Sequence, residues 1–411
     1  MGGFLIQANS RALLPDALLV HALRLEERVG FLTDARGRIL ELAPESALPP
    51  GKWERFPGEV WTAAPVLAHA HLDGFDAPAG SFRRAPFAAW IADLLAWRAD
   101  SRRLTAAASA RAACAELAAT GCGLVAAHVS EAGAEGCGED PEVLAWREVL
   151  EPFPEDAQEA EARWRRAGSE CAAGLALHAP YTVDVGLARR IFAAASGPIS
   201  VHLGETEEER ECLARGTGPL ADLLRARRGR ASATCHASPV DWLAEAGGLR
   251  PGTLAVHAGA LRGEELRRLA AAGVAVVFCP GTHAWFGRPP PAFAEAGVFP
   301  SALGCDSRAS NETLDPIREF RLYCAQVPEA GPARAWHALT EGGARAVRRA
   351  DLGRLAPGAS ARPLRLRDQR VLDALRRHAD PAQRASALLR FLAECPDPAR
   401  LGARIPDPLH A

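Results

Sequence analysis

Two patterns of apolar residues divide this chain of 411 residues. Up to about residue 60, short apolar stretches such as DALLVHALRL and VGFLTDARGRILELA are separated by turn signals such as Arg36-Gly37, which is the pattern of a small β-sheet. From residue 61 to about residue 340, short continuous apolar runs alternate with stretches rich in Ala, Leu and Arg. Buried strands that each precede a helix are typical of a parallel sheet covered by helices.

Seven apolar runs are clear in this second region, and an eighth strand is expected at Leu144–Leu150, where the pattern is weaker. The runs are VLAHAHLD, GLVAAHVS, GLALHAPYT, PISVHLGET, GTLAVHAG, VAVVFCPGT and FPSALGCDS. Helices are expected at ASARAACAELAAT, VGLARRIFAAA and GEELRRLAAAG, and Gly273 is placed to cap the last of them. Eight such units would close a (β/α)8 TIM barrel of the α/β class.

The barrel pattern stops after about residue 340. The segment LGRLAPGASARPLRL predicts a further short strand that pairs with the N-terminal sheet, and residues 371–411 are helical and then rich in proline. We therefore predict three parts. A small β-sandwich comprises residues 1–60 and 341–370, the barrel comprises residues 61–340, and a helical appendage with a loose tail comprises residues 371–411.

Residues that can bind a metal ion follow most of the apolar runs. They are His69, His71, His128, His178, His202, His257 and Asp306. The carboxyl ends of barrel strands meet at one face, which is where barrel enzymes carry their catalytic groups. His69 and His71 are two residues apart, so both side chains leave the same face of a strand. Taken alone, the H-x-H pair could equally be two ordinary core or surface histidines.

Composition excludes several classes of protein. The hydrophobic fraction of 48% and the charged fraction of 24% are those of a globular protein, and a net charge of −2 gives no reason to expect nucleic acid or an anionic membrane as partner. No signal peptide or membrane-spanning run is found. The ten cysteines show no C-x-x-C spacing, which favours a cytoplasmic enzyme with reduced thiols.

The motifs resemble those of the amidohydrolase superfamily, in its branch of cytosine, guanine and S-adenosylhomocysteine deaminases. The matching segments are AHAHLD, HAPYTV, VHLGETEEE, AVHAGALRGEE, VFCPGTH, LGCDSRASN and GARAV…DLGRLAPGAS, which span residues 60–358. The resemblance implies one divalent ion on His69, His71, His202 and Asp306. Such donors suit Zn²⁺, and also Fe²⁺ or Mn²⁺. Many relatives bridge two ions with a lysine inside the barrel, but the only lysine here is Lys52, so a single ion is expected.

The resemblance also implies catalytic roles for Glu205, His257 and Asp306. Glu205 in the H-x-x-E motif would shuttle protons to the substrate, His257 would contact the metal-bound water, and Asp306 would take a proton from that water while binding the ion. The acidic run of Glu205 is also a favourable first helical turn, which is the alternative explanation for it.

The implied reaction is hydrolytic deamination of an aminopurine nucleoside-like compound. Metal-bound hydroxide would attack the amino-bearing ring carbon and release ammonia. The stretch VHLGETEEERECLARGTGPLADLL is similar to aminodeoxyfutalosine deaminases of the alternative menaquinone pathway, while S-adenosylhomocysteine, methylthioadenosine and adenosine stay open as substrates. His178, Arg83 and Trp285 are candidate substrate contacts, although Arg83 and Trp285 could also be ordinary loop residues. The segment CPGTH lacks the arginine that relatives carry at CPRS, which leaves one substrate contact open.

Other functions use the same residues. A guanine deaminase or a triazine amino- or chlorohydrolase would need the same ion and water, and an inactive metal-binding barrel could be a scaffold or sensor. The last alternative predicts a missing catalytic group, whereas the sequence retains all of them. His236 is expected to pack at a helix start, and the roles of His128 and His283 stay open. The expected partner is a small molecule, and a homo-oligomer is in line with the family.

Overall fold

The computed structural model describes residues 11–49, 51–77, 79–130, 133, 140–150, 162, 174–228, 235–394 and 402–404. The chain divides into two compact units, one of residues 1–67, 115–124 and 315–411 and one of residues 68–114 and 125–314. This division by compactness is separate from the predicted domain boundaries, which stay a prediction. The expected strand at FLIQA lies outside the described residues.

Eight strands form one sheet whose order follows the sequence from β6 to β13. They are β6 Val66–His71, β7 Leu124–Val129, β8 Glu142–Val149, β9 Leu175–Leu177, β10 Ile199–Leu203, β11 Thr253–His257, β12 Ala275–Phe278 and β13 Ala302–Leu303. The pairs from β8 to β13 are parallel. All seven predicted runs are strands, and the weak eighth strand is confirmed as β8.

The last strand returns to the first and closes the barrel. A parallel bridge joins Ala70 to Asp306, and the amides of His71 and Cys305 donate to the carbonyls of Asp306 and His69 at 3.0 Å each. A side chain at Gly304 would lie 2.8 Å from the Cβ and the carbonyl oxygen of His69. The closure therefore requires glycine beside a histidine of the H-x-H motif.

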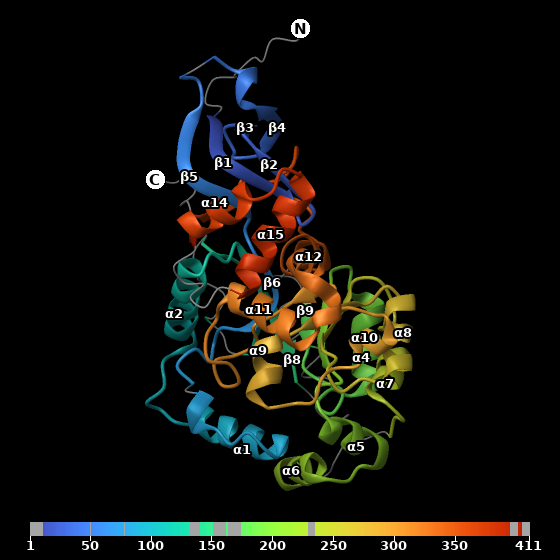
Figure 1. Cartoon of the computed structure of the whole chain (residues 1–411). Helices are drawn as coiled ribbons and strands as arrows, with labels where there is room; N and C mark the ends of the chain where they lie inside the picture. Colours follow the sequence, from blue (N-terminus) through green and yellow to red (C-terminus); the bar gives the residue numbers. More distant parts are fainter. Residues whose placement is uncertain are drawn as a thin grey trace. The chain divides into compact units, whose positions relative to one another are not determined.

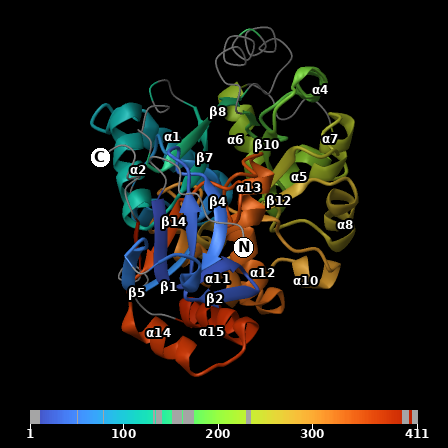
Figure 2. The ribbon, with the colours of Figure 1, turned by 90° about the horizontal axis from the view of Figure 1, so that it is seen from above.

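Helices follow the strands on the outside of the barrel. In Figure 2, helices α4, α5, α7, α8 and α10 lie along one side of it, outside β10 and β12. The helices in this part of the chain are α1 Phe87–Arg98, α2 Ala106–Ala119, α4 Val185–Ala194, α5 Glu207–Arg215, α6 Pro219–Arg228, α7 Pro239–Glu245, α8 Gly263–Ala271, α9 Pro280–Trp285 and α10 Phe293–Ala296, with a 3₁₀ turn at Ala79–Ser81. Strands such as β7 and β10 are buried at every position, which explains their continuous apolar runs.

The first unit contains a seven-stranded sheet built from both flanks of the chain. Its strands are β1 Arg11–His21, β2 Arg24–Glu27, β3 Val29–Thr33, β4 Ile39–Pro44, β5 Glu54–Ala63, β14 Pro363–Leu366 and β15 Gly402–Arg404. Strand β14 pairs antiparallel with β5, which confirms the predicted pairing of the C-terminal segment with the N-terminal sheet. Part of the expected loose tail is ordered, because β15 pairs with β14, while residues 395–401 and 405–411 lie outside the described residues.

Helices also belong to this unit, and Figure 1 shows α14 beside β5. They are α11 Pro316–Gln326, α12 Gly331–His337, α13 Gly343–Ala346, α14 Gln369–Arg376 and α15 Pro381–Glu394, with 3₁₀ turns at Glu45–Ala47 and Pro328–Ala330 and a π-helical turn at Ala338–Gly342. Helices α14 and α15 lie where the sequence predicts a helical appendage, whose bounds as a separate part stay a prediction. Apolar residues of β1 alternate between two cores, since Leu13 packs with Trp61 whereas Leu14 packs with Trp53.

A buried ion pair joins β5 to β14. The Arg365 guanidinium donates to both oxygens of Glu59, with a distance of 2.5 Å from Nε to Oε2, and Arg367 donates to Oε1 at 2.7 Å. The indole of Trp61 donates to Oε2 at 2.6 Å, and Arg365 lies over the ring of Phe56. Burial alone would raise the pKa of Glu59, but the hydrogen bonds from Arg365 and Trp61 outweigh it and hold the pKa below its usual value.

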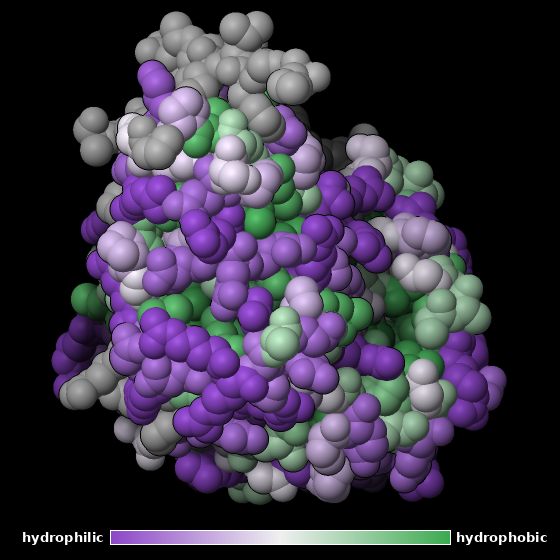
Figure 3. Space-filling view, turned by 45° about the horizontal axis from the view of Figure 1, so that its top comes forward, coloured by the Kyte–Doolittle hydropathy of each residue, from purple (hydrophilic) through white to green (hydrophobic). Residues whose placement is uncertain are grey.

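The face in Figure 3 is covered mainly by hydrophilic residues, with apolar residues in small separate patches. Among the described residues, no helix combines the length and the hydrophobicity that crossing a bilayer requires.

We expect Glu59→Gln to destabilise the protein by about 3–5 kcal/mol, because it leaves the Arg365 charge buried without its partner. Since the folded-state pKa of Glu59 is lowered, this stabilisation is present at neutral pH and is lost as the pH falls through that pKa. Chemical denaturation measures both effects. The matched control is Glu54→Gln on the same strand, where the Arg11 pair is exposed and contributes about 1 kcal/mol or less. Equal losses in the two variants would contradict the assignment.

Candidate metal centre

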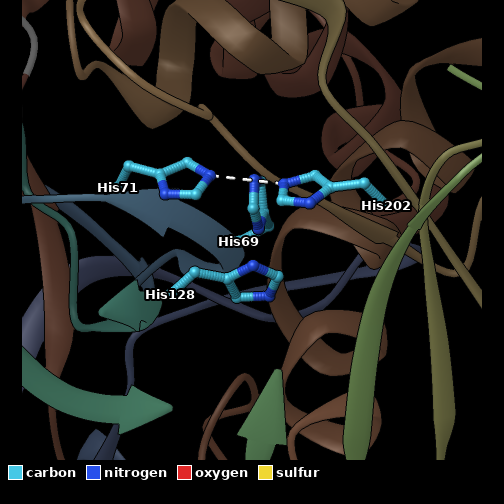
Figure 4. A group of neighbouring side chains, drawn as sticks. All are labelled: His69, His71, His128 and His202. Atoms are coloured by element: carbon cyan, nitrogen blue, oxygen red, sulfur yellow. Dashed lines mark hydrogen bonds between the residues drawn. The ribbon is translucent and has the colours of Figure 1, made fainter. Parts of the chain in front are cut away.

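The barrel brings together histidines from the ends of four strands. Figure 4 shows His71 and His202 pointing toward each other, with His69 between them and His128 below. Besides the group of Glu148, His178 and His202, two overlapping sets of four residues have all their donor atoms within 4.8 Å of one another. They are His69, His71, His128 and His202, and His69, His202, His257 and Asp306.

Three distances among the four predicted ligands are close to those of a tetrahedral site, while each set of four above contains His128 or His257 in place of one predicted ligand. The distance from His71 Nε2 to His202 Nε2 is 3.3 Å, and Asp306 Oδ1 lies 3.4 Å from His69 Nε2 and 3.7 Å from His71 Nε2. Ligands about 2.0–2.1 Å from a tetrahedral ion lie about 3.3–3.4 Å apart. The donor set therefore fits a divalent ion of this kind.

The two oxygens of Asp306 have different surroundings. Thr282 and Ser310 donate their hydroxyl protons to Oδ2 at 3.0 and 2.9 Å, and both residues are fully buried. Oδ1 is the oxygen that faces His69 and His71. The hydroxyls thus fix the carboxylate so that one oxygen is directed at the histidines. No sequence pattern points to either hydroxyl, because both residues reach Asp306 only through the fold.

A backbone carbonyl sets the tautomer of His202. Its Nδ1 lies 2.7 Å from the carbonyl oxygen of His178, which can only accept, so Nδ1 carries the proton and Nε2 keeps its lone pair. The His178 ring lies 5.2 Å from that of His202, and its Nδ1 contacts the Thr182 hydroxyl at 2.5 Å. His178 therefore orients a candidate ligand through its carbonyl group, and its ring lies beside the cluster.

The surroundings keep His69, His178 and His257 neutral. Burial lowers the pKa of His69 well below its usual value, and it lowers the pKa of His257 and of His178 to about 4. Burial by itself would raise the pKa of Asp306, but the hydrogen bond with His69 and the electrostatic interaction with the nearby His257 ring outweigh it and hold the pKa well below its usual value. Neutral imidazoles and an ionised carboxylate are the forms that bind a metal ion.

Two residues of the site adopt the left-handed backbone conformation. His257 has φ of 73° and Asp306 has φ of 58°, and each stands where its strand ends. Such conformations cost about 1–3 kcal/mol for residues other than glycine and concentrate at functional sites. The barrel therefore holds both residues in a strained backbone conformation that places their side chains in the cluster.

Glu205 lies just after β10 and is 7% exposed. Its Oε1 accepts from the Arg288 guanidinium at 2.8 Å, and its Oε2 lies 3.8 Å from His257 Nε2. Burial would raise the pKa of Glu205, but the electrostatic interactions with His257 and with the Arg288 guanidinium outweigh it, so the pKa lies below its usual value. Arg288, which stacks on Phe286 at 4.3 Å, was not a predicted site residue.

A second acidic side chain near the cluster was also missed. Glu148 on β8 is 3% exposed, accepts from the Ser130 hydroxyl at 2.6 Å and lies 3.5 Å from His128 Nδ1. His128 Nε2 lies 2.8 Å from the Ser200 hydroxyl, whereas its Nδ1 has no hydrogen-bond partner among the described residues. The only signal in the sequence was the weak strand in which Glu148 lies.

The other candidate residues are distributed as follows. Arg83 lies on the surface, where its guanidinium pairs with Asp93 at 2.6 Å. Trp285 packs into an apolar cluster with Phe82, and Arg84 stacks on its ring at 5.2 Å. Two further histidines form hydrogen bonds away from the cluster. His236 Nε2 bonds Glu245 on α7 at 3.1 Å, and His283 donates from Nε2 to the Pro289 carbonyl at 2.8 Å. The structure therefore does not show Arg83 or Trp285 in contact with the histidines.

Comparison with solved structures gives the same fold. The chain is similar to Helicobacter pylori aminofutalosine deaminase in complex with methylthio-coformycin, with a TM-score of 0.78 and 19% identity over 93% of this chain and 96% of that one. It is also similar to an adenosine deaminase from Xanthomonas campestris with bound zinc, with a TM-score of 0.72 and 22% identity over 95% of this chain and 90% of that one.

Sequence comparison identifies the family. Aminodeoxyfutalosine deaminase of Deinococcus radiodurans is 34% identical over 319 residues, which are 71% of this chain and 74% of that protein. A 5-methylthioadenosine/S-adenosylhomocysteine deaminase of Pyrococcus abyssi is 31% identical over 161 residues, which are 36% of this chain and 32% of that protein. The Amidohydrolase family model matches residues 66–362, and the chain therefore belongs to the amidohydrolase family.

Proposed function

We propose that this protein is a metal-dependent hydrolytic deaminase of an aminopurine nucleoside. The observation that carries the proposal is the position of Glu205, a buried carboxylate that lies beside His257 at the edge of the His69, His202, His257 and Asp306 group. A structural metal site has no need of such a group, whereas hydrolysis of an aromatic amine needs one that can move protons.

We propose His69, His71, His202 and Asp306 as the ligands of one divalent ion, with Zn²⁺ as the ion. The spacing of their donor atoms supports this set, as does the lowered pKa of His69, which keeps that imidazole neutral. When bound there, such an ion supplies Lewis acidity and makes water nucleophilic at neutral pH.

The side chains of this protein then perform the proton transfers. Asp306 has one oxygen fixed by Thr282 and Ser310, and the other is available to accept a proton at the ligand cluster. Glu205 carries a proton to a ring nitrogen and then to the departing ammonia. His257 is uncharged and lies 3.8 Å from Glu205, so it can hydrogen-bond a developing negative charge on the opposite side.

The relatives support the substrate class. The two curated relatives named above carry the names of deaminases of adenine nucleosides, and the more extensive match is to the aminodeoxyfutalosine enzyme. We therefore propose aminodeoxyfutalosine as the first substrate to test, and with it a role in menaquinone biosynthesis. His178, which lies beside the cluster, is the proposed substrate contact with the best placement, while Arg83 and Trp285 stay predictions.

The seven cysteines in the described part of the chain are free thiols, which supports the proposed cytoplasmic location. The expected homo-oligomer stays a prediction.

We expect the purified protein to carry about one divalent ion per chain, and His202→Ala or Asp306→Asn to lose it, because each change removes one donor from the set. Elemental analysis after gel filtration measures the ion content. His236→Ala is the control, since His236 is also buried but pairs with Glu245. Retention of the ion in both ligand variants would overturn the assignment.

We expect ammonia release from at least one compound of a panel of aminodeoxyfutalosine, methylthioadenosine, S-adenosylhomocysteine and adenosine, with guanine and an aminotriazine as competing substrates. Glu205→Gln should lower kcat by about 10²–10⁴-fold and leave the ion bound, because the carboxamide cannot carry the proton. Glu207→Gln, two residues on and exposed, is the matched control. No turnover of any aminopurine by the ion-loaded protein would refute the proposal.

We expect Arg288→Ala to raise the pKa of Glu205, because the guanidinium of Arg288 is a nearby positive charge that lowers it. If Glu205 must be ionised to accept its first proton, the acid limb of kcat/KM against pH moves to higher pH. The control is Arg189→Ala, whose exposed guanidinium pairs with Glu245. An acid limb at the same pH in all three proteins would show that Glu205 does not control it.

A further inference from the structure

Glu205 belongs to the run ETEEE, and the structure separates the roles of these acidic residues. Glu207 is exposed and pairs with Arg262 at 3.2 Å. Glu208 accepts from the amides of Phe87 and Ala88, at 2.5 and 3.1 Å, and so caps the start of α1. Glu209 is only 1% exposed, and its carboxyl group bonds neither Arg262 nor the start of α1 but other backbone amides. The run is therefore not simply a solvated helix start.

The Glu209 carboxylate turns back toward the strand. Its Oε1 accepts from the amide of Gly204 at 3.1 Å, and its Oε2 accepts from the amide of Glu205 at 2.7 Å. These two amides lie in the turn between β10 and α5, before Thr206, the N-cap residue of α5. Both oxygens of one buried side chain thus hold the backbone of the residue that we place in catalysis.

A glutamate in an ordinary capping box bonds only the amide of the N-cap residue, not the residues before it. Glu265 occupies the same third position of α8, but there Oε2 accepts from the amide of the N-cap residue Arg262 at 2.6 Å, and both oxygens also bond Arg210. In α5 the N-cap position is already served by Thr206, whose hydroxyl accepts from the Glu209 amide at 3.0 Å. Capping α5 therefore does not explain why Glu209 reaches beyond the helix start.

Contacts other than those of Glu209 also restrict the backbone conformation of this turn. Gly204 has φ of 63°, and a Cβ there would lie 2.2 Å from a methyl carbon of Leu261. The Gly204 carbonyl accepts from the Ala260 amide at 2.8 Å, so its other polar group is held from the β11 side. With both groups bonded, the chain leaves β10 in one direction and directs Glu205 toward Arg288 and His257.

Burial raises the pKa of the Glu209 carboxyl to about 8, and the hydrogen bonds from the amides of Glu205 and Gly204 act in the opposite direction because they favour the carboxylate. Burial of this acid is unfavourable, and the hydrogen bonds from the two backbone amides offset part of that free energy. A neutral isostere removes that cost, so Glu209→Gln is expected to fold.

From these contacts we propose that Glu209 is a positioning residue for the reaction: it fixes the backbone of Gly204 and Glu205 so that the Glu205 carboxylate stays aligned for proton transfer. The inference rests on the proposed function, in which Glu205 is the proton carrier. A displacement of about 1 Å at a catalytic group can lower the rate by about 10²-fold.

The first measurement needs no substrate. In Glu209→Gln, one oxygen becomes an amide nitrogen that cannot accept a hydrogen bond, so one of the two backbone amides loses its partner. Hydrogen exchange in the segment of Gly204 and Glu205 should therefore accelerate by about 10-fold or more, as a peptide-resolved exchange experiment measures. Glu265→Gln, the same change at the same position of α8, should leave these two amides unchanged. Unchanged exchange in Glu209→Gln would overturn the clamp, whether or not the protein is a deaminase.

The second measurement uses the substrate that the panel identifies. Glu209→Gln should lower kcat by about 10–100-fold with a KM within about twofold, while the ion content stays that of the wild type. Glu265→Gln should keep kcat, and Glu209→Asp, which retains the carboxylate, should recover part of the loss. A kcat equal to that of Glu265→Gln would overturn the positioning role, and loss of the ion would show instead that Glu209 supports the ligand cluster.

These results separate the two proposals. If the wild type releases no ammonia from any compound of the panel, the proposed function fails while the exchange measurement still decides the clamp. If the wild type is active and the clamp is absent, only the positioning role of Glu209 fails.

Discussion

Closure of the barrel between β6 and β13 is the constraint on which the site depends. Two backbone hydrogen bonds join the strand of His69 and His71 to the residues around Asp306, and they lie directly beside these side chains. The same contact that completes the sheet therefore brings a carboxylate 3.4 Å from an imidazole 237 residues away in the sequence. Gly304 permits the approach, because a larger residue there would collide with His69.

The site is built in layers around this closure. Carbonyl and hydroxyl groups that bind neither substrate nor ion fix the inner side chains: the His178 carbonyl orients His202, and Thr282 with Ser310 orients Asp306. The clamp of Glu209 on the Glu205 amide follows the same principle with a carboxylate as the acceptor. Preorganisation of this kind lets a catalytic group act without rearrangement during the reaction.

Burial of ionisable side chains is unfavourable in free energy, and the fold compensates for it in two ways. In the flanking sheet, Glu59 is stabilised by two arginines and an indole, so a full charge is buried with its partners. In the barrel, burial instead keeps His69, His178 and His257 uncharged. The first arrangement joins two distant segments of chain, while the second prepares donors for an ion.

The sequence by itself determined the strand order, the pairing of the two flanks and the identity of the residues at the strand ends. It could do so because buried parallel strands have continuous apolar runs, and because the carboxyl ends of such strands meet at one face. Only the tertiary structure decided which atoms meet. Arg288 reaches Glu205 across 83 residues, Glu148 lies beside His128 from a strand with a weak pattern, and Arg83 turns to Asp93 on the surface. Such contacts depend on loop paths and side-chain directions, which leave no periodic signal in the sequence.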